Sequence, residues 1–137
     1  MSHLVDTCVL SELVSSRPDE NVISWFENTA QEGLYLSVLS LGEIRKGVEK
    51  MPQGRRRDRI MGWLEHDLPA WFEDRMLPVD KHVADEWGRL LSKAERTFPA
   101  INSLIAATAL CHRLTIVTRN VKDFNLPGLD TLNPWLG

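Results

Sequence analysis

Four polar side chains occupy positions from which they would form one acidic site. Asp6 follows directly on two apolar, strand-forming residues, and Glu43 is expected in the first turn of the helix after a second strand. Asn102 is expected to open an apolar helix, and Asp123 comes shortly after a later strand. Because the carboxyl ends of parallel strands share one edge of a sheet, these side chains are predicted to gather there.

Carboxylates crowded together resist ionisation unless a cation neutralises them. A hard divalent ion such as Mg²⁺ suits this role, because it prefers carboxylate oxygens and keeps several bound waters. A metal ion with bound water in turn suits the hydrolysis of phosphodiester bonds, because it activates water and offsets charge on the scissile phosphate. The four positions therefore predict a metal-assisted hydrolytic centre.

Each of these residues also has a purely structural interpretation. Ser40 and Glu43 have the spacing of a capping box, Asn102 is a favourable N-cap residue, and Asp123 fits a turn that bonds its own backbone. Asp6 is the hardest to explain in this way, because a carboxylate directly after a buried strand needs a partner. The two roles are compatible, since a capping glutamate can also hold a metal.

The elements that would position these residues alternate between strands and helices. Short apolar runs predict strands at 4–5, 34–37, 76–79 and 114–118, with a possible edge strand at 129–132. Helical spacing predicts helices near 9–13, 22–30, 41–51, 60–68, 83–94 and 102–110, with Pro69 kinking or breaking its segment. This order predicts an α/β fold with a small central parallel sheet and helices on both faces.

The composition is that of an ordinary globular domain. The chain has 137 residues, of which 43% are hydrophobic and 26% are charged, so one domain spanning 1–137 is expected. The two cysteines, Cys8 and Cys111, form no metal-binding pattern and are expected to be reduced. No secretory signal or membrane-spanning run is recognisable, so a cytoplasmic protein without membrane contact is expected.

The positive charges form one local concentration in a chain whose net charge is -3. A run of basic residues between positions 45 and 59 would attract nucleic-acid phosphates, although a solvated turn explains its triple arginine slightly better. Arg45 and Arg119, near the expected acidic edge, are better candidates for holding phosphate or for pairing with the carboxylates. The five tryptophans mostly lie on helical stripes, which favours packing over base stacking.

Several segments together resemble a known family. The chain is similar throughout its length to PIN-domain ribonuclease toxins of the VapC type, including the FitB-like members. The residues that carry the resemblance are Leu4-Val5-Asp6-Thr7, Glu43 with Gly47, Ile105-Ala106-Ala107-Thr108-Ala109, Thr118-Arg119-Asn120-Val121-Lys122-Asp123-Phe124 and Leu132-Asn133-Pro134-Trp135.

This resemblance implies a PIN-like three-layer α/β/α sandwich and an endoribonuclease that depends on Mg²⁺ or Mn²⁺. It also implies the toxin of a type II toxin-antitoxin system, paired with a cognate VapB-type antitoxin. The expected assembly is a toxin homodimer bound to two or more antitoxin chains, with RNA as the substrate. Contact with DNA is expected only indirectly, through the antitoxin.

Carried across by position, the family's catalytic set falls on Asp6, Glu43, Asn102 and Asp123. Asp6 and Asp123 are then the main metal ligands, and Glu43 contributes directly or through water. Asn102 departs from the family, which usually has aspartate there. Asparagine keeps one acceptor oxygen but loses the charge, so we expect weaker metal binding or activity. A natural and an introduced change would look the same in the sequence.

Other residues near the expected acidic edge could position water or phosphate: Thr118 and Asn120 at the end of their strand, Thr7 after the first strand, and the basic residues Arg45 and Arg119. For Thr7, a simple helix cap is the favoured alternative. Two other functions stay open at this point. A catalytically degenerate PIN module would act through antitoxin binding and operon repression, with Asn102 as its native residue. An RNA-processing PIN nuclease would work without an antitoxin.

Overall fold

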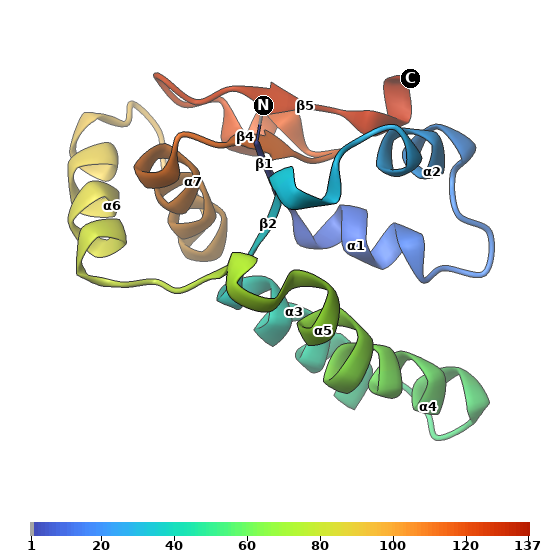
Figure 1. The fold of residues 1–137 in the computed structure, drawn as a ribbon. Coiled ribbons are helices and arrows are strands. Elements are labelled where there is room, and N and C mark those ends of the chain that lie inside the picture. Colours follow the sequence, from blue (N-terminus) through green and yellow to red (C-terminus); the bar gives the residue numbers. More distant parts are fainter. Residues whose placement is uncertain (1) are drawn as a thin grey trace.

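Five parallel strands form the centre of the computed structural model, which describes residues 2–137 (Figure 1). The strands run side by side in the order β3-β2-β1-β4-β5. Their bounds are β1 His3–Val5, β2 Leu34–Ser37, β3 Met76–Leu77, β4 Thr115–Val117 and β5 Thr131–Leu132. The predicted parallel sheet is therefore confirmed, although the third strand ends two residues earlier than expected.

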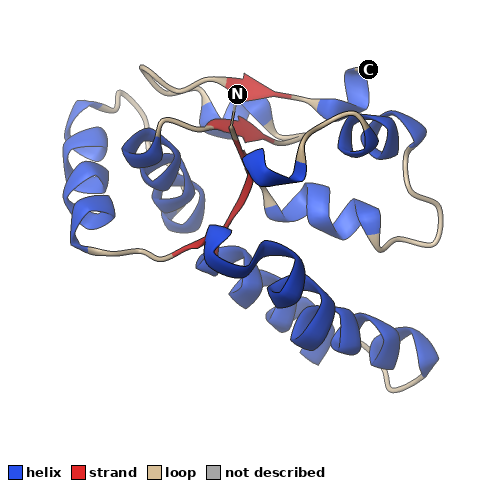
Figure 2. Ribbon diagram, in the orientation of Figure 1, coloured by secondary structure: helices blue, strands red, loops and turns tan. Residues whose placement is uncertain are grey.

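Within residues 2–137, seven α-helices flank this sheet, and helices lie to either side of it (Figure 2). No helix in residues 2–137 is both long and apolar enough to cross a membrane. Short 3-10 turns include η1 Gln31–Gly33, η3 Glu73–Arg75, η4 Val121–Phe124 and η5 Pro134–Leu136. The α-helices are α1 Thr7–Leu13, α2 Glu20–Glu27, α3 Val38–Glu49, α4 Arg55–Gly62, α5 Leu68–Phe72, α6 Lys81–Lys93 and α7 Ala100–His112.

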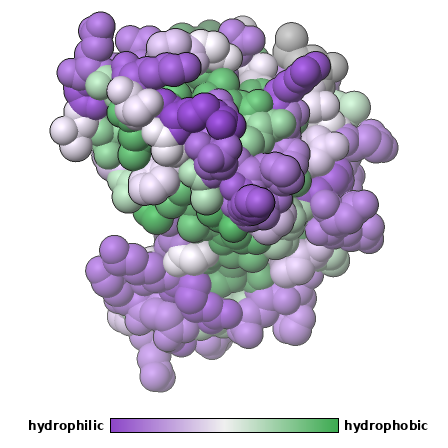
Figure 3. Space-filling view, turned by 90° about the vertical axis from the view of Figure 1, so that its left-hand side faces the viewer, coloured by the Kyte–Doolittle hydropathy of each residue, from purple (hydrophilic) through white to green (hydrophobic). Residues whose placement is uncertain are grey.

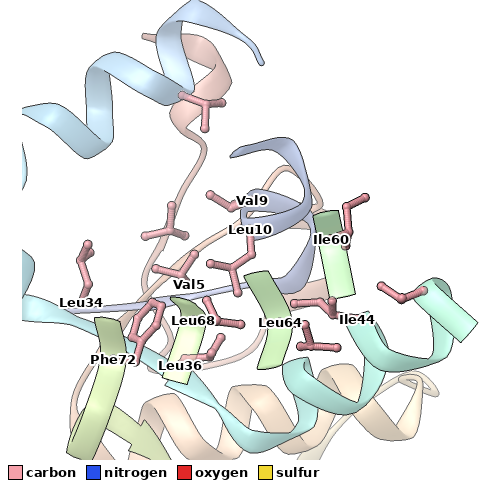
Figure 4. Close-up of a cluster of buried hydrophobic side chains, with 13 residues drawn as sticks. Val5, Val9, Leu10, Leu34, Leu36, Ile44, Ile60, Leu64, Leu68 and Phe72 are labelled. Carbon is pink, nitrogen blue, oxygen red and sulfur yellow. The ribbon is translucent and has the colours of Figure 1, made fainter. Parts of the chain in front are cut away.

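The two faces of the sheet pack against different helices because side chains alternate along each strand. Leu4 of β1 and Ile116 of β4 belong to a core cluster that includes residues of α6 and α7. Val5 and Val117, the next residues, belong to the cluster shared with α1 to α5 (Figure 4). The sheet is thus covered on both faces, as the α/β/α prediction requires.

Helix α6 shows how the outer layer meets solvent. Val83 and Leu90 face inward and are buried. Figure 3 looks onto the side of the molecule where α6 lies; hydrophilic side chains cover much of it, and apolar side chains show between them. This division is the one expected of an amphipathic helix that covers a sheet.

Two helix starts differ from the sequence prediction. Helix α7 begins at Ala100 with Pro99 as its N-cap, so Asn102 is the third helical residue and the N-cap interpretation is wrong. Helix α3 begins at Val38, and the Ser37 side chain accepts a hydrogen bond from the Leu39 N–H. Glu43 therefore lies in the second turn of α3, and the capping box of Ser40 and Glu43 is wrong.

The helical segment before Pro69 is distorted, as its proline predicts. Residues Trp63–Asp67 form a π-helical turn, and α5 starts directly after it with Pro69 in its first turn. Proline has no N–H to donate and its ring clashes with a carbonyl of the preceding turn, so the regular hydrogen-bond ladder is interrupted directly before it. The segment therefore continues as a helix across the proline with a local change of pitch.

The core predicts a clear difference between two leucines. Leu68 is 1% exposed and packs in the cluster of Figure 4, whereas Leu136 is 82% exposed. Leu68→Ala should lower the free energy of unfolding by about 2–5 kcal/mol, because it removes buried methyl groups and leaves a cavity. Leu136→Ala, the matched control, should change it by less than about 0.5 kcal/mol in the same urea titration. Equal effects would contradict the described packing.

Candidate active site

The site is centred on Asp6, which lies at the carboxyl end of the central strand β1. In the order β3-β2-β1-β4-β5, β2 and β3 lie on one side of β1, and β4 and β5 lie on the other. Ligands of open α/β sheets bind where the strand order reverses in this way. Asp6 stands at that point beside Thr118, which directly follows β4.

Three groups hold the Asp6 carboxylate. One oxygen accepts a hydrogen bond from the Thr7 N–H at 2.8 Å, so Asp6 is also the N-cap of α1. The other oxygen accepts one from the fully buried Thr118 hydroxyl at 2.8 Å. The Cys8 thiol lies 3.6 Å from that same oxygen. The carboxylate is thereby fixed in one orientation across β1 and β4.

Burial works against the charge on Asp6. Its side chain is almost completely shielded from solvent, and this burial is the main reason that its pKa lies above the usual range. The negative charge of Asp123 raises the pKa further, whereas the hydrogen bonds from Thr118, Thr7 and Cys8 lower it in part. A cation at this position would remove the penalty of the ionised form.

Thr7 joins Glu43 to Asp6. The Thr7 hydroxyl donates to a Glu43 carboxylate oxygen at 2.6 Å, and it lies 2.9 Å from the Ser40 hydroxyl. Because the Thr7 N–H is bonded to Asp6, one residue contacts both acids. Thr7 and Glu43 also line a cavity of about 250 Å³ between α1, α3 and α4.

Asp123 reaches the site through a short turn. It belongs to η4 and is half-buried, and its N–H bonds to the Asn120 carbonyl at 2.9 Å. The Asn120 N–H in turn donates to the Thr118 hydroxyl at 3.0 Å. A continuous set of hydrogen bonds therefore runs from the turn that carries Asp123, through Thr118, to Asp6.

Two residues of this site were missed by sequence reasoning. Ser40 and Cys8 both contact the predicted set, and Cys8 also lies 3.7 Å from the Thr118 hydroxyl. Burial, and then the charge of Asp6, raise the pKa of the Cys8 thiol, which favours its neutral form. The available signal was their spacing, because Cys8 comes two residues after Asp6 and Ser40 three residues before Glu43. Small side chains of these types also fill ordinary cores.

The side chains of the remaining predicted residues make no hydrogen bond to this set in the described chain. The Arg45 guanidinium lies 3.2 Å from Glu49 and 3.7 Å from Glu65, and the Arg119 guanidinium stacks 5.1 Å from the ring centre of Trp135. Asn102 is half-buried in the first turn of α7, and its side chain has no hydrogen bond to the three acids in the described chain.

The donor set has the chemistry of a hard-cation site with incomplete protein ligation. Asp6, Glu43 and Asp123 offer oxygen ligands, and none of them forms a salt bridge with a basic side chain in residues 2–137. In the same range, no three His, Cys, Asp or Glu side chains are grouped closely enough to hold a metal ion by themselves. This set fits a cation that retains much of its water, as Mg²⁺ does.

Comparison with known proteins shows the family of the chain. The PIN domain family matches residues 3–126. A curated relative, the VapC ribonuclease Y4jK of Sinorhizobium fredii, is 35% identical over 96% of each chain. Toxin FitB of Neisseria gonorrhoeae is 33% identical over 96% of this chain and 97% of its own length.

Structural similarity leads to the same family. The crystal structure of FitAcB from Neisseria gonorrhoeae contains a chain that superposes with a TM-score of 0.90 at 33% identity. The superposition covers 96% of this chain and 97% of that one. The chain therefore belongs to the PIN domain family, with VapC and FitB proteins as its relatives.

Proposed function

We propose that this protein is the toxin of a type II toxin-antitoxin system and a metal-dependent endoribonuclease that hydrolyses RNA phosphodiester bonds. The observation that supports the proposal is the buried carboxylate of Asp6 at the reversal point of the sheet, which is linked to Glu43 through Thr7 and feels the charge of Asp123. In residues 2–137 none of these three acids has a cationic partner. The relatives support the reaction class, because one is named a VapC ribonuclease and another is named a toxin.

Mg²⁺ or Mn²⁺ would be held by Asp6 and Asp123, with Glu43 contributing directly or through water. When bound, such an ion supplies a positive charge that activates water and stabilises the negative charge that develops on the phosphate. The support on the protein's side is the buried, hydrogen-bonded carboxylate of Asp6, whose pKa is raised chiefly by burial and further by Asp123.

The chain's own residues divide the remaining work. The Thr118 hydroxyl fixes the orientation of Asp6, and Thr7 fixes that of Glu43. Glu43 borders the cavity between α1 and α3, so its carboxylate would orient an attacking water and accept its proton. Asn120 holds the Thr118 hydroxyl through its N–H, which also ties the Asp123 turn to the site.

Asn102 would limit the activity. An amide oxygen contributes a dipole where a carboxylate would contribute a full negative charge, and the amide N–H groups repel a cation. We therefore propose that metal affinity or turnover is reduced in this chain. A catalytically degenerate module, which acts only by binding its partner, is the second function that Asn102 favours.

The proposed partner is a cognate antitoxin of the VapB or FitA kind. A FitAB structure bound to a DNA fragment has a chain that superposes on this protein with a TM-score of 0.88 at 30% identity. An uncompensated acidic site attracts a basic side chain for the same reason that it attracts a metal ion. The proposed assembly is a toxin homodimer with antitoxin chains, and DNA is contacted only through the antitoxin.

RNA cleavage tests the reaction directly. The purified chain should fragment total RNA in the presence of Mn²⁺ or Mg²⁺, and EDTA should stop the reaction because the acids alone do not activate water. Asp6→Asn should reduce the rate by about 100-fold or more, the scale expected for one catalytic group. Asp74→Asn, at an exposed acid, is the control. Cleavage that persists in EDTA or in Asp6→Asn would refute the mechanism.

The metal-free fold should become more stable when Asp6 loses its charge. The folded pKa of Asp6 is raised, so the folded state holds its proton more tightly than the unfolded chain, and ionisation at neutral pH costs stability. Asp6→Asn should therefore raise the melting temperature by a few degrees at neutral pH. This gain should shrink as pH falls through the folded pKa of Asp6 toward the unfolded value.

The same pair of proteins reports metal binding. Mn²⁺ should raise the melting temperature of the wild-type chain, because it binds only the folded site, and should raise that of Asp6→Asn far less. An equal Mn²⁺ shift in both proteins would show that Asp6 is not a ligand. Indifference of the wild-type chain to Mn²⁺ would favour the degenerate module.

Restoring a carboxylate at position 102 tests the proposed deficit. Asn102→Asp should increase Mn²⁺ affinity or the RNA cleavage rate by about 10-fold or more, the effect typical of a group that completes a metal site. Asn102→Ser, which is also neutral, should give no gain. If Asn102→Asp and Asn102→Ser behave alike, Asn102 is not the missing ligand.

A further inference from the structure

A cavity outside the candidate active site lies beside the turn that carries Asp123. Its volume is about 670 Å³, which is within the range of about 300–1,000 Å³ typical of small-molecule sites. It lies between the segment that links α6 to α7 and the segment that follows η4. The residues used below are Lys93, Glu95, Arg96, Phe98 and Asn125.

Arg96 connects this cavity to the turn that carries Asp123. Its guanidinium donates a hydrogen bond to the carbonyl of Lys122, the residue directly before Asp123. The same guanidinium stacks over the Phe98 ring, with 4.2 Å between its central carbon and the ring centre. Because the ring supports one face of the guanidinium, its remaining N–H groups are held at the cavity wall with little freedom to lose on binding.

The cations of this cavity are available to a ligand. Arg45, Arg57 and Arg89 each lie within salt-bridge distance of a glutamate or aspartate. In residues 2–137, neither Lys93 nor Arg96 has such a partner. Glu95 supplies one negative charge, so the cavity side chains carry a positive balance in a chain of net charge -3.

A positive cavity next to the acidic centre would offset the repulsion between the carboxylates and an RNA strand. Three carboxylates repel a polyanion, so a strand that reaches Asp123 must gain attraction from phosphates on either side of the reacting one. The cavity offers two cationic side chains for a phosphate, and the exposed Asn125 amide can bond a base or a ribose hydroxyl.

We propose that this cavity binds a nucleotide of single-stranded RNA that flanks the scissile phosphate, with Lys93 and Arg96 contacting its phosphate. The proposal rests on the proposed function and extends it by giving the strand a path from the Asp123 turn toward the end of α6. Glu95 moderates the affinity by repelling the same phosphate.

Binding without cleavage tests this path. A fluorescein-labelled uridine 10-mer is titrated in EDTA, and its anisotropy reports the dissociation constant at several salt concentrations. Lys93→Gln and Arg96→Gln should each weaken binding about 3- to 10-fold and reduce the salt slope by about 0.7, the value for one lost phosphate contact on a single strand. Glu95→Gln should strengthen binding, which a merely structural loss would not do.

Lys81→Gln is the matched control, because Lys81 is an exposed lysine at the opposite end of the same helix. It should leave the dissociation constant and the salt slope unchanged. If Lys93→Gln and Arg96→Gln bind the 10-mer like wild type, or if Lys81→Gln weakens binding as much as they do, the cavity is not an RNA site.

The Mn²⁺ melting shift separates binding from support of the Asp123 turn. Lys93→Gln should keep the wild-type shift while it weakens RNA binding. If Arg96→Gln weakens RNA binding and also lowers the Mn²⁺ melting shift, Arg96 acts by supporting the Asp123 turn. Its assignment as a phosphate ligand is then overturned. Failure of the proposed function has a different signature: total RNA stays intact with Mn²⁺, although the 10-mer still discriminates between Lys93→Gln and Lys81→Gln.

Discussion

The hydrogen bond between Thr118 and Asp6 is the interaction on which the site depends. It joins residues 112 positions apart in the chain, at the ends of the two strands between which the sheet order reverses. A carboxylate buried to this extent must be satisfied by donors, and Asp6 has the Thr7 N–H, the Thr118 hydroxyl and the Cys8 thiol. The Thr7 hydroxyl in turn donates a hydrogen bond to Glu43. The Thr118 hydroxyl accepts one from the Asn120 N–H, which belongs to the turn that contains Asp123. Each acid is therefore positioned relative to Asp6 and not independently of it.

These hydrogen bonds orient the acids but leave their charge uncompensated. Neutral hydroxyl and backbone donors satisfy the lone pairs of Asp6, while burial and the charge of Asp123 still raise its pKa. A site of this kind gains free energy from any cation that reaches it, whether a divalent metal or a basic side chain of a protein partner. The same charge would repel an RNA strand, and the proposed RNA site beside the Asp123 turn would offset this repulsion with its cationic side chains.

Local rules were sufficient for the type of most elements and insufficient for their ends. Apolar runs and periodicity located the five strands and most of the helices, although α5 beyond Pro69 was not predicted. The nearly continuous apolar run of α7 correctly predicted a buried helix. The starts of α3 and α7 were misplaced because several nearby residues are acceptable caps. In α3 the N-cap is Ser37, which accepts a hydrogen bond from the Leu39 N–H, and not Ser40. In α7 the N-cap is Pro99, and Asn102 lies within the first turn. Which candidate residue caps a helix depends on the position and direction of the chain where it enters the helix. The tertiary structure sets both, and local composition does not contain that information.

By itself, the sequence determined the alternation of elements, the placement of Asp6 after the first strand and the family likeness, because these follow from side-chain periodicity and from motifs of adjacent residues. Only the tertiary structure decided which distant groups meet. Thr118 donates a hydrogen bond to Asp6, and Thr7 donates one to Glu43. Arg45 forms ion pairs with Glu49 and Glu65, and Arg119 stacks on Trp135. The physical reason is that a hydrogen bond or ion pair between segments depends on strand order, helix rotation and the distance between side-chain atoms. Those quantities are set when the two cores pack, and no stretch of neighbouring residues encodes them alone.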